Sequence, residues 1–461
     1  MLTTKSSKRA LPLAAGLVSA AALLAGCAGG GASNGGSAPT ATATSGSVTW
    51  WTWTGTPQVD NSYIAAFNKA YPNIKVTLKF VEESDSDAAL RPALESGSGP
   101  DVFQITAGYR VPEFATFTDD LTAAAEKALG PDWKSKLAPL GVQPLISNGK
   151  LVALSDGSVS AGTLWINADL FAKYKLSPPR TVSQWASDCA VFKSHGVTCF
   201  VQGAGSASGP WVRDDIQALA DSIDPTAWTD AEKGTGKWTA PAIVQALTVW
   251  KSMFSDGIVQ PGALGIEQEP DAQTAFSKGQ AAMVAMGTWE SSFATKAGMT
   301  AGMSSAGVAN PTPFPIVPIP FPSATSTPST KFTVFGNSDS ALAVNAKSPN
   351  AGAATTFAVW LATSPAAQQV VADNLDDVPS LKGVQPQWST IDLVDSSVQL
   401  APVKQLMAAA SATTEDRNAL LSAQTLTAIG DAGSSVAAGQ STPAQAAASI
   451  QAAAQQSGGN Q

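Results

Sequence analysis

Tryptophan side chains at three places in the sequence could bind a ligand that contains rings. Trp51 and Trp53 alternate at the end of the first predicted strand, so they should share one face of it. Trp211 lies in a glycine-rich loop, and Trp289 follows a second short glycine-containing turn. A rigid indole plane can stack on the apolar face of a ligand ring. Trp51 and Trp53 either line such a site or pack in a core, and Trp211 either lines the site or anchors its loop, whereas the neighbouring Trp50 is expected in the core.

Polar candidates lie where other strands are predicted to end. Open α/β sheets bind ligands beyond the carboxyl ends of their strands, so side chains at those positions can reach a ligand. They are Glu83, Tyr109 and Arg110. Carboxylates, amides and hydroxyls exchange hydrogen bonds with ligand hydroxyls, and arginine offers several donors in a fixed fork. The alternative for Tyr109 and Arg110 is a solvated loop.

The composition argues against several other classes of function. The 461 residues include 27 Lys+Arg and 35 Asp+Glu, which give a formal net charge of −8. No basic cluster occurs beyond the first ten residues, so a nucleic-acid partner is not expected. One histidine, His195, and three cysteines are too few for a zinc or iron cluster, and one imidazole is too few for most catalytic triads. We therefore expect no metal and no cofactor.

The first 47 residues predict export and a lipid anchor. Three basic residues within the first nine precede an apolar stretch over residues 11–24, which is too short for a permanent membrane helix but fits a signal peptide. The sequence LAGC that ends at Cys27 resembles the lipobox of bacterial lipoproteins, which implies a signal peptide of residues 1–26 and a lipidated Cys27. Residues 27–47 should then form a flexible linker to the outer face of the cytoplasmic membrane. The alternative is an ordinary signal peptide with an incidental cysteine.

The other two cysteines, Cys189 and Cys199, leave two readings open. Thiols outside the cytosol usually pair, which predicts one disulfide. Two buried free thiols remain the alternative, because a ten-residue spacing does not guarantee that the Cα atoms lie close together.

Strands and helices alternate in the first part of the folded chain. The strand that ends in the tryptophans is followed by a predicted helix over residues 63–70 and a strand over residues 74–80. A helix over residues 88–95 and a strand over residues 101–105 repeat the pattern. This alternation predicts an α/β fold with a largely parallel sheet.

Several stretches along residues 48–461 together carry a family resemblance. Residues 66–76 read AFNKAYPNIKV, and residues 96–102 read SGSGPDV. Further along, residues 149–154 read GKLVAL and residues 164–171 read LWINADLF. The most specific stretch, AFSKGQAAM, leads directly to Trp289. In these stretches the chain resembles the family 1 extracellular solute-binding proteins, relatives of maltose-binding protein.

This resemblance implies two α/β lobes that enclose a ligand in a central cleft, with hinge strands crossing between them more than once. It places Asn337, Ser338 and Asp339 where a crossing strand meets the cleft, as further candidates for binding the ligand. The N-lobe is expected to comprise residues 48–158 and 338–392, and the C-lobe residues 159–337 and 393–461. Residues 310–331 depart from the family pattern because they are rich in Pro, Ser and Thr. We expect an extended, ordered loop there.

The resemblance also implies a function. It places Trp289 where the family stacks a sugar ring, and Tyr109 and Arg110 where the family contacts sugar hydroxyls. The implied role is that of a monomeric substrate-binding lipoprotein of an ABC importer. It would capture a mono- or oligosaccharide and deliver it to permease subunits served by a separate ATPase. Alternatives are a binding protein for another solute, a ligand sensor of the same fold, or an exported glycosidase that uses a pair of acidic residues.

Overall fold

The computed structural model describes residues 43–457. The predicted signal peptide (1–26), Cys27 and most of the predicted linker (27–47) lie outside the described residues. Among the described helices, none is both long and apolar enough to span a membrane.

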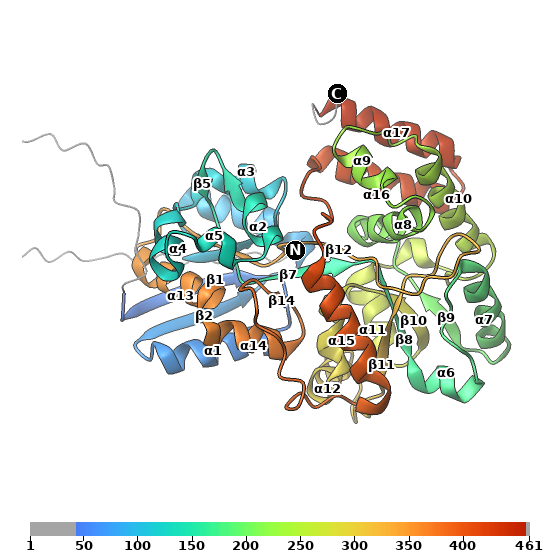
Figure 1. Ribbon diagram of the computed structural model, residues 1–461, viewed down its shortest axis with the longest axis horizontal. Helices are drawn as coiled ribbons and strands as arrows, with labels where there is room; N and C mark the ends of the chain where they lie inside the picture. The colour runs from blue at the N-terminus through green and yellow to red at the C-terminus, as the bar shows by residue number, and fades with distance from the viewer. Residues whose placement is uncertain (1–42, 458–461) are drawn as a thin grey trace, which may run out of the picture. The chain divides into compact units, whose positions relative to one another are not determined.

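A five-stranded sheet in the order β2-β1-β3-β13-β6 organises the part of the chain that we call the first lobe (Figure 1). Strands β2, β1 and β3 are parallel, as the alternation predicts, whereas β13 runs antiparallel to both of its neighbours. The strands are β1 (Gly46–Thr52), β2 (Ile74–Phe80), β3 (Val102–Ile105), β6 (Leu154–Ser155) and β13 (Ala341–Val344), with a small hairpin of β4 (Ile146–Ser147) and β5 (Lys150–Leu151). The helices of this lobe are α1 (Pro57–Ala70), α2 (Glu83–Ser96), α3 (Arg110–Phe114), α4 (Thr122–Leu129), α5 (Trp133–Lys136), α13 (Ala351–Thr363) and α14 (Pro365–Asn374).

Local sequence signals explain how β1 and α1 form. Val48 and Trp50 of β1 are buried and alternate with exposed residues, and the Trp50 ring packs edge-on against Phe357 at 5.3 Å in the core. Helix α1 starts earlier than predicted because the Thr56 hydroxyl accepts a hydrogen bond from the backbone N–H of Val59. The turn between β1 and α1 is consequently short, and it carries Trp53 at the edge of the sheet.

A four-stranded sheet in the order β11-β8-β10-β9 organises the second lobe. It is mixed rather than largely parallel, because β8 is antiparallel to both β10 and β11 while β9 is parallel to β10. Its strands are β8 (Thr163–Asn167), β9 (Thr198–Val201), β10 (Ala281–Ala285) and β11 (Ile316–Pro320). Its helices are α6 (Ala168–Tyr174), α7 (Val182–Ser194), α8 (Gly209–Ile223), α9 (Ala227–Glu232), α10 (Pro241–Ser255), α11 (Gln273–Ser277), α12 (Lys296–Ser305), α15 (Ser396–Ala412), α16 (Ala423–Ala437) and α17 (Pro443–Gln456).

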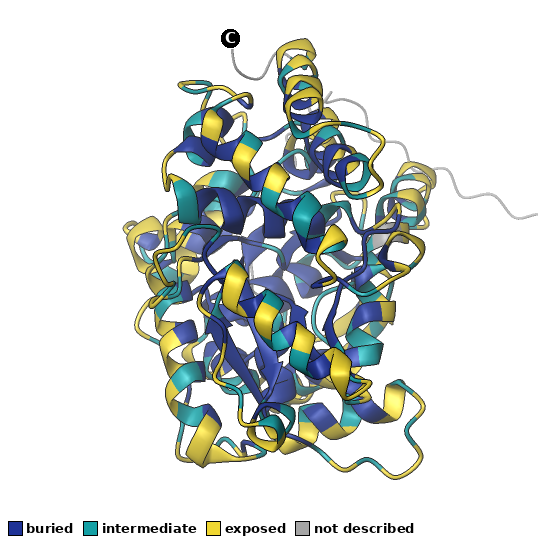
Figure 2. Ribbon diagram, turned by 90° about the vertical axis from the view of Figure 1, so that its right-hand side faces the viewer, coloured by how far each residue is buried: buried dark blue, intermediate teal, exposed yellow. Residues whose placement is uncertain are grey.

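Burial in the second lobe follows its layers. Figure 2 shows the strands buried at the centre, while the surrounding helices expose their outer sides to solvent. Trp185, Trp228, Trp238 and Trp250 all lie in the core of this lobe, each with no more than 1% of its surface exposed. These indoles are therefore structural, which leaves few tryptophans for a ligand site.

The segment over residues 310–331 differs in part from the expected loop. Residues Ile316–Pro320 form β11, which pairs with β8 at the edge of the second sheet. An edge position tolerates Pro318 and Pro320, because a proline there lacks only an N–H that the sheet does not need. The prolines thus obscured a strand whose apolar residues are buried.

The chain passes between the two lobes at three short strands. β7 (Gly157–Ala161) follows β6 and precedes β8, β12 (Phe335–Asn337) leads back from β11 to β13, and β14 (Val378–Pro379) follows α14. The three strands form one antiparallel sheet in the order β12-β7-β14. The crossing segments are therefore hydrogen-bonded to one another rather than independent linkers.

Candidate ligand-binding cleft

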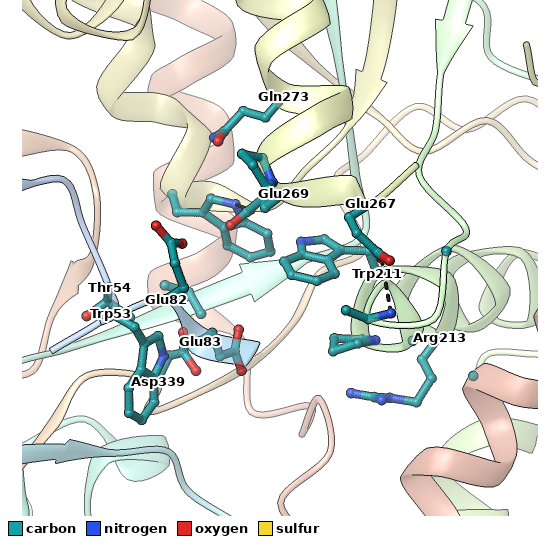
Figure 3. A pocket seen from close by; sticks show the side chains of 18 of the residues that line it. Trp53, Thr54, Glu82, Glu83, Trp211, Arg213, Glu267, Glu269, Gln273 and Asp339 are labelled. Carbon is teal, nitrogen blue, oxygen red and sulfur yellow. Dashed lines mark hydrogen bonds between the residues drawn. The ribbon is translucent and has the colours of Figure 1, made fainter. Parts of the chain in front are cut away.

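A cavity of about 1500 Å³ is lined by residues from both lobes and from the segments that cross between them. Figure 3 shows Trp53 and Asp339 on one side of it and Trp211, Arg213 and Glu267 on the other. Aromatic, acidic and basic side chains share its walls: Trp53, Tyr109, Trp211 and Trp289; Glu82, Glu83, Asp87, Glu267, Glu269, Asp339 and Asp376; Arg110, Arg213 and Arg417. A site with flat apolar planes and convergent polar groups suits a ligand that is both cyclic and rich in hydroxyls.

Trp53 and Asp339 are positioned by one buried glutamine. The side-chain oxygen of Gln104 accepts hydrogen bonds from the backbone N–H groups of Trp53 (2.8 Å) and Thr54 (3.1 Å). Its Nε2 donates to the carbonyl oxygen of Asp339 at 2.7 Å. Gln104 lies on β3 between β1 and β13. This one residue therefore holds both the segment that follows β1 and the segment that precedes β13, where they border the cavity.

An arginine lies against the tryptophan of the first lobe. The Arg110 guanidinium lies 4.8 Å from the centre of the Trp53 ring. Two carboxylates hold it there, since Arg110 Nε lies 3.0 Å from Asp87 Oδ1 and Arg110 Nη1 lies 3.4 Å from Glu83 Oε1. Tyr109 Oη also donates to Asp87 at 3.3 Å. The indole plane is thereby held by contacts that exist before any ligand arrives.

One of the two cleft tryptophans of the second lobe, Trp289, is held in the same way. The Arg417 guanidinium lies 5.1 Å from the centre of the Trp289 ring, and its Nε and Nη2 donate to Asp214 at 3.0 and 2.7 Å. Trp289 Nε1 donates to Glu269 Oε1 at 3.1 Å. Gly287 is required beside this ring, because a Cβ at that position would lie 2.0 Å from a Trp289 ring carbon. Cation–π contact and hydrogen bonding together fix the orientation of the indole.

Burial shifts the pKa values of three carboxyl groups in the cleft upward. It raises the pKa of Glu269 to about 8 and that of Asp376 to about 7. The pKa of Asp339 rises to about 6, first through burial and then through the nearby charge of Glu83, while Arg417 opposes the rise. These groups hold protons in the folded protein at pH values where unfolded carboxyls, with pKa values of about 4, are ionised.

These pKa shifts predict that the free protein becomes less stable as the pH rises. A raised folded-state pKa gives stability that is fully present below about pH 4 and is lost as the pH rises through about 6 to 8. We expect the melting temperature, measured at constant ionic strength, to fall between pH 5 and pH 8.5. Glu269→Gln should flatten part of this fall, whereas Glu126→Gln on the exposed side of α4 should not. A melting temperature that rises steadily over this pH range would contradict the prediction.

Seven of the ten side chains predicted to bind a ligand line this cavity. They are Trp53, Glu83, Tyr109, Arg110, Trp211, Trp289 and Asp339. The structure thus brings together residues that are up to 286 positions apart, from Trp53 to Asp339.

The structure places the other three predicted side chains elsewhere. The ring of Trp51 lies 3.5 Å from the ammonium nitrogen of Lys79 on the neighbouring strand and packs against the core of the first lobe. Asn337 and Ser338 are buried at the crossing strand β12, where Asn337 Nδ2 donates to Asn418 and Ser338 Oγ donates to Ser155. Trp51 and Trp53 do not share a role because β1 ends at Thr52, after which the alternation no longer applies.

Three lining residues of the cleft, Arg213, Glu269 and Arg417, were not singled out from the sequence, and neither was Asp214, which binds Arg417. Asp214 and Arg417 are 203 residues apart, and nothing in the local sequence pattern around either one indicates their pairing. Glu269 lies just before α11, within the irregular helical turn η5 (Gln268–Ala272), where no strand end marks it. Among residues 43–457, no cluster of three or more His, Cys, Asp or Glu side chains has the geometry to hold a metal ion.

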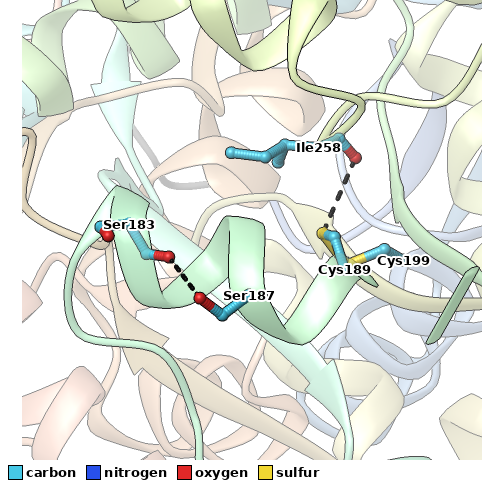
Figure 4. The surroundings of a disulfide bond; sticks show 5 residues. All are labelled: Ser183, Ser187, Cys189, Cys199 and Ile258. Carbon is cyan, nitrogen blue, oxygen red and sulfur yellow. Dashed lines mark hydrogen bonds between the residues drawn. A yellow bond between two sulfur atoms is a disulfide. The ribbon is translucent and has the colours of Figure 1, made fainter. Parts of the chain in front are cut away.

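The disulfide lies in the second lobe, outside the residues that line the cleft. The structure joins Cys189, on α7, to Cys199, on β9, with the Cα atoms 5.0 Å apart (Figure 4). Both cysteines are buried, and the carbonyl oxygen of Ile258 lies 4.0 Å from Cys189 Sγ. Of the two readings that the sequence leaves open, the structure has the paired one.

Removing this disulfide is expected to destabilise the second lobe. Closing a loop of this length lowers the entropy of the unfolded chain by an amount worth about 2–3 kcal/mol. The Cys189→Ala, Cys199→Ala double variant should therefore unfold at a lower urea concentration than the wild type under oxidising conditions. Reduction of the wild type should move its midpoint in the same direction. If the variant and the wild type unfold at the same midpoint, the bond contributes nothing to stability.

Comparisons with known proteins agree with this architecture. The model of the bacterial extracellular solute-binding protein family matches residues 50–368, which is more than half of the chain. An uncharacterized ABC transporter extracellular-binding protein of Pyrococcus horikoshii is 27% identical over 159 residues. That match covers 33% of this chain and 36% of the relative, so only about a third of the relative's length is spanned.

Solved structures match over most of the chain. A protein from a study of xylan utilization by Caldanaerobius polysaccharolyticus has a TM-score of 0.69 and 24% identity, with 88% of this chain and 99% of that protein covered. The GacH receptor of Streptomyces glaucescens, solved without ligand and with acarbose, has a TM-score of 0.67 and 20% identity, with 89% and 98% covered. At these identities the likeness establishes the two-lobe fold with its central cleft. The fold and the family match lead to one conclusion: the chain belongs to the bacterial extracellular solute-binding protein family.

Proposed function

We propose that this protein captures a carbohydrate in the cleft between its lobes and delivers it to the permease of an ABC importer. The observation that carries the proposal is the arrangement of Trp53, Trp211 and Trp289 around one cavity, with carboxylates and arginines between them. Sugars have flat C–H faces that stack on indoles and hydroxyl edges that bind such polar groups. A similarly folded protein, the GacH receptor, was solved in complex with acarbose and compared with an acarbose-loaded maltose binding protein, which is consistent with this ligand class.

The proposed cycle needs binding without covalent chemistry. The two indoles of the second lobe and the one of the first lobe would contact the same ligand only when the lobes approach each other, so the ligand would favour a closed form. The permease and its separate ATPase would recognise that form and release the sugar. Lipidation of Cys27 and the linker up to residue 47 would tether the protein, as a monomer, to the outer face of the cytoplasmic membrane. The lobe bounds expected from the sequence, with the changes of lobe near residues 158, 338 and 392, are retained as part of this proposal.

A thermal-shift screen tests the ligand class directly. The mature chain from residue 27, with Cys27→Ser to prevent lipidation, is melted with saccharides, amino acids, polyamines and nucleosides. A ligand that binds only the folded state raises the melting temperature. Saccharides should give the largest increases, and chromatography should recover them unchanged. If the melting temperature increases only with non-sugars, the protein binds another class of solute. If the sugar is cleaved, the protein is an enzyme and the proposal is wrong.

A further inference from the structure

One cation in the cleft, that of Arg213, has no partner among the residues that the structure describes. Arg213 lies in the first turns of α8, lines the cavity, and is only 7% exposed. Within the described part of the chain, residues 43–457, its guanidinium makes neither an ion pair nor a hydrogen bond. The other two arginines of the cleft differ in this respect, since carboxylates pair with both Arg110 and Arg417.

The carboxylates near Arg213 are engaged elsewhere. Both oxygens of Asp214 accept hydrogen bonds from Arg417. Glu83 is paired with Arg110, and Glu267 accepts hydrogen bonds from Ala207 N and Ser208 Oγ. The acidic side chains of the described residues therefore leave the Arg213 guanidinium without an acceptor.

Arg213 nevertheless keeps its charge at neutral pH. Its pKa is lowered to about 10, mainly by burial; Asp214 opposes this shift, and the positive charge of Arg417 contributes to it. A buried cation without a counterion is unfavourable, so an acceptor supplied by a ligand has a large advantage at this position. A carboxylate matches the planar fork of arginine with two parallel hydrogen bonds, and such charge-assisted bonds are about twice as strong as neutral ones.

The residues around Arg213 indicate what kind of ligand would carry a carboxylate to this position. Trp211 lies two residues earlier on the same helix, and in Figure 3 its indole and the Arg213 side chain border the same space. A ring stacked on Trp211 could therefore direct a substituent toward Arg213. Other carboxylates, those of Glu82, Glu83 and Glu267, also line the cleft, and these would repel a second anionic group.

We propose that the ligand is a mono-acidic carbohydrate, in which one uronic acid carboxylate pairs with Arg213 and the remaining rings are neutral. This inference rests on the proposed carbohydrate function and narrows it to one chemical class. Neutral rings would stack on Trp53 and Trp289 and donate hydroxyl hydrogen bonds to the carboxylates, while the single acid group would occupy the Arg213 end.

Calorimetric titration of the mature chain with Cys27→Ser tests the inference. The probes are neutral di- and trisaccharides, the same sugars with one glucuronic or galacturonic acid residue, and the methyl esters of those uronates. The esters keep the shape of the ligand and remove its charge. We expect the uronate to bind about 10- to 100-fold more tightly than its ester. Equal binding of acid and ester would overturn the inference, and this comparison needs no variant.

Two variants locate the effect. Arg213→Gln should bring the ratio of acid to ester affinity close to one, and Arg213→Lys should leave an intermediate ratio because it keeps the charge but loses the fork. Arg180→Gln, at an exposed position outside the cavity, makes the same change in net charge and should keep the wild-type ratio. An unchanged ratio in Arg213→Gln would overturn the assignment. If neutral saccharides bind and uronates do not, only this inference fails; if no saccharide binds, the proposed function fails as well.

Discussion

Replacing Trp289 with alanine should weaken carbohydrate binding by about 30- to 1,000-fold, the range expected when a central aromatic anchor worth about 2–4 kcal/mol is removed. The variant loses the stacking plane of the second lobe. It also leaves Arg417 without the ring beneath it and Glu269 without its hydrogen-bond donor. The dissociation constant, measured by calorimetry for the best saccharide of the thermal-shift screen, is the readout.

Two further variants separate the role of the ring from a general loss of aromatic surface. Trp289→Phe keeps a stacking plane but cannot donate to Glu269, so its affinity should lie between those of the wild type and Trp289→Ala. Trp388→Ala removes a half-buried indole outside the cavity and should bind like the wild type. Binding by Trp289→Ala within about threefold of the wild type would mean that the ligand does not use this ring.

Removing one partner of the buried ion pair between Asp214 and Arg417 should lower the stability of the second lobe substantially. Both side chains are buried, at 9% and 8% exposed, and Asp214 holds the pKa of Arg417 above its usual value although burial opposes the charge. Arg417→Met should lower the free energy of unfolding by about 3–5 kcal/mol, because it leaves a buried carboxylate without its partner. Urea unfolding followed by tryptophan fluorescence would measure this loss.

A second substitution tests whether the loss comes from the unpaired charge. Asp214→Leu combined with Arg417→Met removes both charges and should recover most of the stability, since apolar side chains of similar volume can replace a buried ion pair at little net cost. Lys296→Met breaks the exposed pair with Asp392 and should change stability by less than about 1 kcal/mol. If Arg417→Met were no more destabilising than Lys296→Met, the buried pair would have no special structural role.

The cleft residues that could be predicted from the sequence mostly lie just after the ends of strands. Trp53 and Tyr109 follow strands that the sequence predicts, and Asp339 follows a crossing strand that the family resemblance implies. The structure places all three in the cavity. Trp289 was found by resemblance, because AFSKGQAAM precedes it. In contrast, Trp51 lies outside the cavity, because the alternation that grouped it with Trp53 ends with β1 at Thr52.

The residues that sequence reasoning missed act through tertiary contacts. Gln104 appears in the sequence as an ordinary position in a buried strand, yet it bonds residues on both sides of β3. Arg417 precedes α16 in a segment without strand periodicity and meets Asp214 only because α16 packs against α8. Similarly, the mixed second sheet was not predicted, because strand direction depends on where the connecting segments run and not on the composition of the strands.

The three crossing strands have a mechanical consequence. A single linker between two lobes would let them swivel about their connection, whereas β12, β7 and β14 are joined edge to edge by hydrogen bonds. We expect such a three-stranded sheet to bend more easily than independent linkers would twist. Opening and closing of the lobes should therefore be a hinge motion about one preferred axis. Trp53 and Trp289 would then return to the same mutual orientation in every opening and closing cycle, so that each captured ring meets the same pair of planes.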